Sequence, residues 1–272
     1  MIESMIYGFI SGLTEFLPVS SQAHQAMLFR MFGIDRRDPI QDMLVHIAIL
    51  FALFVGCKGL FLRIRRENKL AANARRSRIY ELKTMYDLRL VKTAAIPLLL
   101  GLFLYIATEK MEMQLLYIAL FFVINGIILI IPEYLRQGNK EASAMTGMDA
   151  IMIGVFGALS SLPGISRVGA VHSFAVIRGA DQQHAVNWAY MLSIPALLLV
   201  LLFDIIHLIS YGIGTVSFMV TLGYLMSAAA AFVGGYFSII FARRLIMRSG
   251  FTGFAYYSWG TALFSFIIYL IT

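Results

Sequence analysis

Two short segments interrupt the apolar stretches of this chain, and both carry residues that could do chemistry. Residues 12–21 read GLTEFLPVSS and residues 157–166 read GALSSLPGIS, so both follow the pattern Gly-x4-Leu-Pro-x2-Ser. Glu15 and His24 belong to the first segment or lie just after it, and Arg167 follows the second. Paired helix breaks in corresponding halves of a membrane protein indicate a buried site at the interface between repeats.

Arg167 has the residue type and the position expected of an anion ligand. It follows Gly164 and Ser166, near the expected start of a half-helix, where free backbone N–H groups point at an anion. A guanidinium there adds a fork that suits phosphate. The alternatives are an arginine that extends to the membrane surface or one that pairs with a carboxylate, and Glu15 could be that partner.

Glu15 is expected to face a cavity or a partner, because an ionisable group at membrane depth is otherwise costly. Its candidate roles are metal ligand, general acid or base, and proton carrier, and the alternative is a carboxyl that packs between helices. Ser11 lies four residues earlier and therefore on the same helical face, which makes it an auxiliary candidate.

The serines after the two breaks have two interpretations. Ser20, Ser21 and Ser166 could cap the half-helices that follow. They could instead bind phosphate, with Ser21 or Ser166 as a nucleophile, and His24 lies three residues after Ser21, within reach as a base. His172 is a weaker auxiliary candidate.

Composition places the chain in a membrane. Hydrophobic residues make up 60% and charged residues 14%, whereas soluble domains carry about 25% charge. The net charge of +7 does not indicate nucleic acid, because eleven of the 22 basic residues lie in one segment, 58–92, as in a basic cytoplasmic loop, and no nucleic-acid-binding motif accompanies them.

An all-α polytopic membrane protein with about six transmembrane helices and two re-entrant helical hairpins is therefore expected. The hairpins cover 1–33 and 149–178, where each apolar run is too short to cross before its break. The spans are expected at about 41–61, 91–108, 114–135, 184–207, 215–242 and 252–271.

The basic residues also predict orientation and symmetry. Sixteen of the 22 fall on the side of segment 58–92, so both termini and the first hairpin face outward while the second hairpin faces inward. One membrane domain, 1–272, then consists of inverted-topology repeats at 1–135 and 148–272. Small residues at 228–235 indicate close helix packing and allow a homodimer.

The two broken segments resemble signatures of the bacterial undecaprenyl-diphosphatase family, membrane enzymes linked to bacitracin resistance. Residues 12–21 with His24 resemble the first signature, and residues 163–167 resemble the second. The resemblance implies removal of one phosphate from undecaprenyl diphosphate, the lipid carrier recycled in peptidoglycan biosynthesis. It also implies a site between the hairpins, on the outer side of the bacterial inner (plasma) membrane, and dependence on a divalent cation such as Mg²⁺ or Ca²⁺.

Several positions depart from the family pattern, and two of them lie in or beside the signatures. Ser11 stands where the family usually has a second acid, and Val171 stands where it usually has Thr. Glu15 is then the remaining candidate metal ligand, which weakens the expectation of a cation because hard cations prefer several oxygen ligands.

Two functions follow from these residues. In the first, a membrane phosphatase binds the diphosphate through Ser20, Ser21, Gly164, Ser166 and Arg167, with a side chain or water as the nucleophile. In the second, a transporter or flippase for a polyprenyl phosphate keeps the phosphate-binding arginine without catalysis, since broken helices in inverted repeats are common in transporters. A lipid-binding protein without turnover is a third interpretation.

Overall fold

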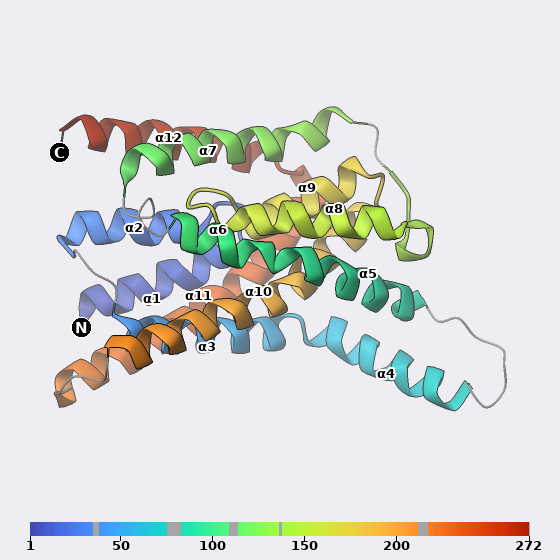
Figure 1. Cartoon of the computed structure of the whole chain (residues 1–272), viewed down its shortest axis with the longest axis horizontal. Coiled ribbons are helices and arrows are strands. Elements are labelled where there is room, and N and C mark those ends of the chain that lie inside the picture. The colour runs from blue at the N-terminus through green and yellow to red at the C-terminus, as the bar shows by residue number, and fades with distance from the viewer. Residues whose placement is uncertain (35–37, 75–82, 109–113, 136–137, 212–216, 272) are drawn as a thin grey trace.

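The structure is a computed structural model that describes residues 1–34, 38–74, 83–108, 114–135, 138–211 and 217–271. The described residues form a bundle of helices (Figure 1). Its helices are α1 (Ile2–Glu15), α2 (Ser21–Phe32), α3 (Pro39–Gly56), α4 (Lys58–Ala74), α5 (Lys83–Leu98), α6 (Leu100–Thr108), α7 (Leu115–Ile130), α8 (Gly147–Ala158), α9 (Arg167–Ile177), α10 (Gln182–Tyr211), α11 (Phe218–Ser249) and α12 (Thr252–Ile271), with 3-10 turns η2 (Ile131–Tyr134), η3 (Ala142–Ala144) and η4 (Leu159–Ser161).

Six helical segments in the described part of the chain are long and apolar enough to cross a membrane. They are Pro39–Gly56, Tyr86–Ala107, Leu115–Tyr134, Gln182–Ser210, Phe218–Ser249 and Thr252–Ile271. These segments confirm the predicted all-α polytopic membrane protein. The second span begins earlier than predicted, because helix α5 starts at Lys83, and it is interrupted at Leu99 after Pro97.

The segment predicted as a basic cytoplasmic loop, 58–92, is helical in its described part, and its cytoplasmic location stays a prediction. Helix α4 follows α3 after Cys57, and α5 covers the residues from Lys83 onward; residues 75–82 lie outside the described residues. Leu60, Phe61 and Ile64 recur at helical spacing and pack on the core, and the lysines and arginines between them are good helix formers. Charge density alone was therefore misleading about secondary structure.

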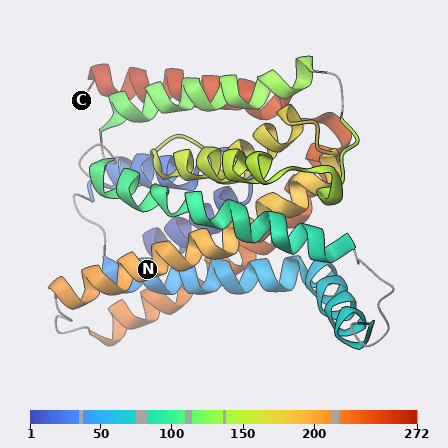
Figure 2. The same ribbon diagram turned by 45° about the vertical axis from the view of Figure 1, so that its right-hand side comes forward.

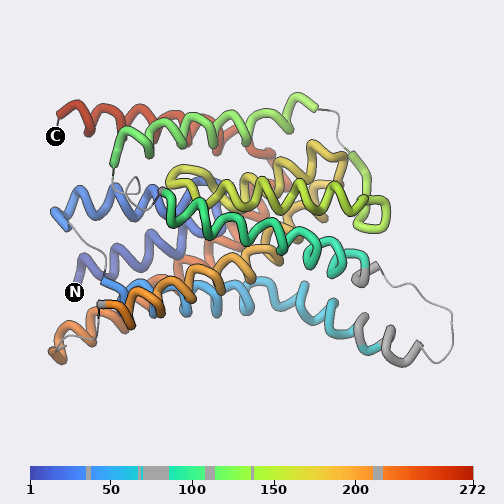
Figure 3. The backbone as a smooth tube through the Cα atoms, viewed as in Figure 1, coloured from blue at the N-terminus to red at the C-terminus, as the bar shows by residue number. Residues whose placement is uncertain are grey.

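Two broken-helix hairpins occupy the centre of the bundle. Helices α1 and α2 are joined through residues 16–20, where Pro18 lacks a backbone donor and disfavours helix before it. Helices α8 and α9 are joined through residues 159–166, where Gly164 has a φ of 127°. From these breaks the first hairpin extends toward the end that holds the N-terminus, and the second extends toward the opposite end (Figures 1 and 3). Re-entry of either hairpin from a membrane surface stays a prediction.

Helices from the two halves of the chain interleave. Helix α11 packs along α1 and α3, and α5 packs along α8. The approach of α1 to α11 is close: a Cβ on Gly12 would lie 2.1 Å from the carbonyl oxygen of Ala231. The small residues of α11 therefore pack against α1 within the chain, which confirms the predicted close helix packing. The homodimer stays a prediction, and this face of α11 is not available to form it.

Helices α7 and α12 pack against each other along one edge of the bundle (Figures 1 and 2). Gly126 on α7 permits this contact, because a Cβ there would lie 2.2 Å from the indole nitrogen of Trp259. The neighbouring residue, Asn125, is fully buried in an otherwise apolar helix. An amide in that position has to find hydrogen-bond partners, and it finds them at the hairpin breaks.

Candidate active site

The breaks of the two hairpins touch through hydrogen bonds that cross from one to the other. The backbone N–H of Gly164 donates to Oγ of Ser20 at 3.0 Å, and Oγ of Ser166 donates to the carbonyl of Leu17 at 3.2 Å. Ser166 also accepts from the N–H of Gly169 at 3.2 Å and so caps α9 as predicted. Ser20, Gly164 and Ser166 thus join the two halves of the site.

Asn125 joins the breaks from a third direction. Its amide nitrogen donates to the carbonyl of Pro18 at 3.2 Å, and its oxygen accepts from the N–H of Ser166 at 2.9 Å. Sequence reasoning missed this residue. Its signal was a single amide within an apolar span, which in lipid marks either a functional group or a helix contact.

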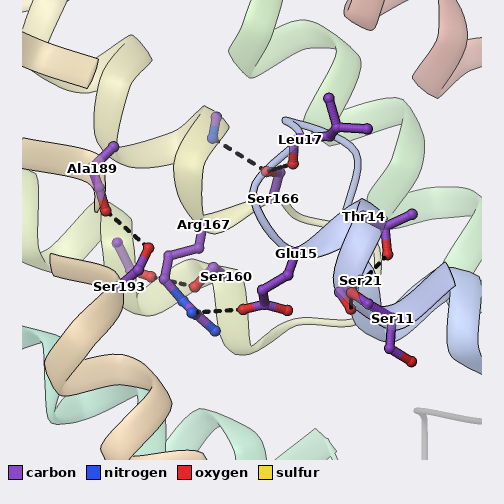
Figure 4. A network of polar contacts seen from close by, with 12 residues as sticks. Ser11, Thr14, Glu15, Leu17, Ser21, Ser160, Ser166, Arg167, Ala189 and Ser193 are labelled. Atoms are coloured by element: carbon purple, nitrogen blue, oxygen red, sulfur yellow. Dashed lines mark hydrogen bonds and ion pairs between the residues drawn. The ribbon is translucent and has the colours of Figure 1, made fainter. Parts of the chain in front are cut away.

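Glu15 and Arg167 form an ion pair between the hairpins. Nη1 of Arg167 donates to Oε1 of Glu15 at 2.8 Å, and their side chains are 14% and 8% exposed. Figure 4 shows the two side chains pointing toward each other from the ends of their hairpins. Nε of Arg167 is buried and has no hydrogen-bond partner among the described residues. A guanidinium with an unused donor and further N–H groups at the pocket can bind an anion.

A polar pocket surrounds this pair and encloses about 270 Å³ of empty space, open solvent included. It is lined by residues of both breaks, namely Thr14, Glu15, Ser20, Ser21, Gln22, Ser160, Ile165, Ser166 and Arg167. The pocket therefore contains the predicted phosphate-binding residues Ser20, Ser21, Ser166 and Arg167, and Gly164 contacts Ser20 at its edge.

Helix α2 begins in this pocket, and no side chain caps its first turn. Ser20 is at the N-cap position but makes no side-chain cap, because its hydroxyl accepts from Gly164 instead. The capping role predicted for Ser20 or Ser21 is therefore wrong. Ser20 has a φ of 64°, a conformation that costs a non-glycine residue about 1–3 kcal/mol. The free N–H groups of an uncapped helix start favour an anion.

Ser21 and Ser11 interact with each other rather than with the ion pair. Oγ of Ser21 donates to the carbonyl of Ser11 at 3.2 Å and accepts from the amide of Gln25 at 3.3 Å. Ser11 is fully buried and donates to the carbonyl of Tyr7. Ser21 lines the pocket, whereas Ser11 does not.

The two candidate histidines lie outside the pocket lining. Nδ1 of His24 is 2.7 Å from the carbonyl of Ser20, which can only accept, so Nε2 accepts from the hydroxyl of Tyr257 at 2.7 Å. Both ring nitrogens are then occupied. His24 therefore does not pair with Ser21, contrary to the predicted role of a base for that serine. His172 is 1% exposed, packs edge-on against Phe251 and also does not reach the ion pair.

An apolar groove leads to the same arginine from the side of α6 and α10. It encloses about 420 Å³, open solvent included, and shares Gln22, Ser160 and Arg167 with the polar pocket. Its other walls are mainly aliphatic and aromatic: Leu98, Gly101, Leu102, Tyr105, Gly157, Ser161, Ala196, Leu199, Val200 and Phe203. A polar end that opens into an apolar groove suits an amphiphilic ligand.

The pocket offers a metal ion few protein ligands. Glu15 is the one carboxylate among its lining residues, and the described residues contain no group of three or more His, Cys, Asp or Glu side chains able to hold a metal. These residues do not fit a protein-built cation site, since hard cations take several oxygen ligands. Glu15 as a metal ligand stays a prediction.

Fold and site together define a polytopic helical membrane protein whose polar site is built where two broken-helix hairpins meet. The profile of the family described as bacitracin resistance protein BacA matches residues 4–264, and the chain belongs to that family.

Curated relatives match nearly the whole chain. A protein named undecaprenyl-diphosphatase from Carboxydothermus hydrogenoformans is 30% identical over 257 residues, which cover 94% of this chain and 93% of the relative. A protein of the same name from Thermosipho melanesiensis is 30% identical, and the match covers 97% of this chain and 98% of the relative. Another from Methanobrevibacter smithii is 27% identical, and the match covers 98% of this chain and 97% of the relative. The resemblance seen in the two signatures is thus confirmed over nearly the whole chain.

Proposed function

We propose that this protein is an integral membrane phosphatase that hydrolyses undecaprenyl diphosphate to undecaprenyl phosphate. The observation that carries the proposal is the geometry at Arg167. Arg167, whose buried Nε–H has no partner among the described residues, lines the same pocket as the uncapped start of α2, at the polar end of an apolar groove. The names of the relatives supply the substrate class.

The diphosphate would bind between the two hairpins. Arg167 would donate to the oxygens of the terminal phosphoryl group, together with the free N–H groups at Ser21 and Gln22. Glu15 would hold the guanidinium in place through its present ion pair. Donors that are fixed before the reaction stabilise the charge that develops during phosphoryl transfer.

Water is the nucleophile that this geometry favours. The hydroxyl hydrogens of Ser21 and Ser166 are directed to backbone carbonyls, those of Ser11 and Leu17. A serine nucleophile needs a base that removes this hydrogen, and both nitrogens of His24 are occupied elsewhere. We infer that neither serine attacks: Ser166 holds the two breaks together, and Ser21 joins α2 to α1.

The polyprenyl tail would lie in the groove between α6 and α10. Contacts with residues such as Leu102, Leu199 and Phe203 would bind the tail through burial of apolar surface, which contributes about 25 cal/mol per Å². For a divalent cation, the lining residues of the polar pocket would supply Glu15 as the one carboxylate ligand.

The cellular setting follows from the same proposal. The protein would reside in the bacterial inner (plasma) membrane with its site facing the outer side, and its product would return to peptidoglycan biosynthesis as the lipid carrier. The basic residues of α4 support this orientation, because basic segments flanking membrane spans favour the cytoplasm.

The test is phosphate release by purified protein in detergent with farnesyl or undecaprenyl diphosphate and Mg²⁺ or Ca²⁺. We expect Arg167→Ala and Glu15→Ala to lower release at least about 100-fold, as removal of a charge-stabilising donor does in other enzymes. Arg178→Ala is the matched control, because Arg178 pairs with Asp149 beyond the other end of α9. Tight binding of a phosphate lipid without release by the wild-type protein would contradict the proposal and favour the transporter.

A further inference from the structure

A second group of ionisable side chains lies beside the candidate active site, along one face of α3. Asp38, Asp42 and His46 are spaced four residues apart, so each lies about 6 Å deeper along the helix than the one before. Asp38 caps the start of α3 through the N–H groups of Ile40 and Gln41. The series therefore leads from the end of α3 toward the interior of the bundle.

Each member of this series has a polar partner on another helix. The hydroxyl of Tyr224 on α11 donates to Asp38, and the hydroxyl of Tyr7 on α1 donates to Asp42. Nδ1 of His46 is 2.7 Å from Oδ2 of Asp204 on α10, and these side chains are 10% and 12% exposed. Asp42 and His46 are buried within the span, where ionisable groups are rare and mark candidate functional sites.

The partner of His46 determines which of its nitrogens is basic. Asp204 can only accept when it is ionised, so Nδ1 carries the hydrogen and Nε2 carries the lone pair. Nε2 makes no hydrogen bond with the described residues. It is also absent from the fully buried polar atoms without a partner, so it is not sealed from solvent. An imidazole oriented by a carboxylate, with its other nitrogen free, is the arrangement of a general base.

His46 also lies within electrostatic range of the active site. The charged groups that act on it are Asp204 from α10, Asp42 on its own helix and Glu15 from α1. These are acidic groups from three elements around it. Glu15 also lines the polar pocket, and Asp204 follows Phe203, which lines the apolar groove that reaches Arg167.

Hydrolysis of a diphosphate ester requires such a proton acceptor. Water adds to the terminal phosphorus, the bridging P–O bond breaks, and the leaving phosphate monoester keeps the electron pair of that bond. With a trianionic substrate the balance is R–OP₂O₆³⁻ + H₂O → R–OPO₃²⁻ + HPO₄²⁻ + H⁺. One proton per turnover therefore has to leave the pocket, where Glu15 is committed to Arg167.

We propose that His46, oriented by Asp204, accepts the proton released in the Glu15–Arg167 pocket and passes it along Asp42 and Asp38 to the surface at the start of α3. This inference rests on the proposed phosphatase function. His46 does not line the pocket, so it acts through intervening water and is a proton-relay residue rather than a group that touches substrate. Nε2 takes the proton, Asp204 stabilises the imidazolium, and the proton then moves to the carboxylates nearer the surface.

The test is the pH dependence of phosphate release from farnesyl diphosphate by the full-length protein in detergent. His46→Gln is expected to lower kcat about 100-fold, the usual contribution of a general base, with KM within about twofold because no phosphate contact is lost. The decline of kcat on the acidic side should disappear. His207→Gln is the matched control, because His207 lies one turn beyond Asp204 on α10, outside the pocket lining, and should change neither parameter.

Asp204→Asn keeps the hydrogen bond to His46 but removes the charge. This second variant tests the relay if His46→Gln fails to fold. Without the carboxylate the imidazolium is less stable, so the acidic decline of kcat should move to lower pH. If the wild-type protein releases phosphate and His46→Gln or Asp204→Asn keeps its kcat and its acidic decline, the relay is wrong and the phosphatase proposal stands. If the wild-type protein releases no phosphate, the proposed function is wrong, and the relay fails with it.

Discussion

Replacing Glu15 with Gln tests whether the two hairpins depend on their ion pair. The pair is short, at 2.8 Å, and both side chains are less than one-sixth exposed. Removing one member of a buried pair leaves an uncompensated charge, which costs about 3–5 kcal/mol. Because the Gln oxygen can still accept from Arg167, we expect the lower end of this range, about 3 kcal/mol, in the free energy of unfolding.

A double-mutant cycle isolates this contribution. Denaturant unfolding in detergent would be measured for the wild-type protein, Glu15→Gln, Arg167→Gln and the double variant. The double variant contains neither charge, so its loss of stability should fall short of the sum of the single losses by about 2 kcal/mol. Losses that add within about 0.5 kcal/mol would refute the reasoning, because the two groups would then be energetically independent.

An anion should repair the single Glu15→Gln variant. Arg167 would keep its charge and its free donors, so inorganic pyrophosphate at about 100 times its dissociation constant should restore about 2.7 kcal/mol. Arg167→Gln provides the control, since it lacks the guanidinium and should gain much less.

Three further substitutions test the surroundings of the pair. Gly164→Ala should destabilise the protein by about 2–5 kcal/mol in the same unfolding assay, because Gly164 has a positive φ and a Cβ would lie 2.6 Å from Phe121; unchanged stability would contradict the turn described here. Asn125→Ala should cost about 2–4 kcal/mol by leaving two buried backbone groups without partners, and a loss near zero would mean that the breaks do not need this residue. His24→Phe keeps the ring between Phe122 and Tyr257 and should lower phosphate release less than about tenfold, whereas abolished release would give His24 a direct role.

The helix breaks and the pairing of Glu15 with Arg167 could be predicted from the sequence because their signals are local. A proline or glycine in an apolar run stops a helix, and a charge next to such a stop requires a partner. With one acidic and one basic residue at the two breaks, few pairings were available. The structure confirms the contact, while the catalytic roles stay predictions.

Other features depend on contacts that the sequence does not display. Asn125 was read as part of a span because its partners, Pro18 and Ser166, are distant in sequence. His46 was given no role, since Asp204 is 158 residues away. The segment 58–92 was read as a loop because its charge was weighed above its helical spacing of apolar residues. Capping of α2 was predicted from residue type, but Ser20 faces the second hairpin instead.

The most direct test of the central claim is to observe both hairpins while one phosphate ligand binds. The ¹⁵N–¹H signals of Arg167 Nε and of the backbone amides of Ser21 and Gln22 would be followed in nanodiscs during titration with inorganic pyrophosphate. Because one pocket contains all of these groups, we predict that the signals shift together with a single dissociation constant. Shifts confined to one hairpin, or two different dissociation constants, would show that the breaks do not form one phosphate site.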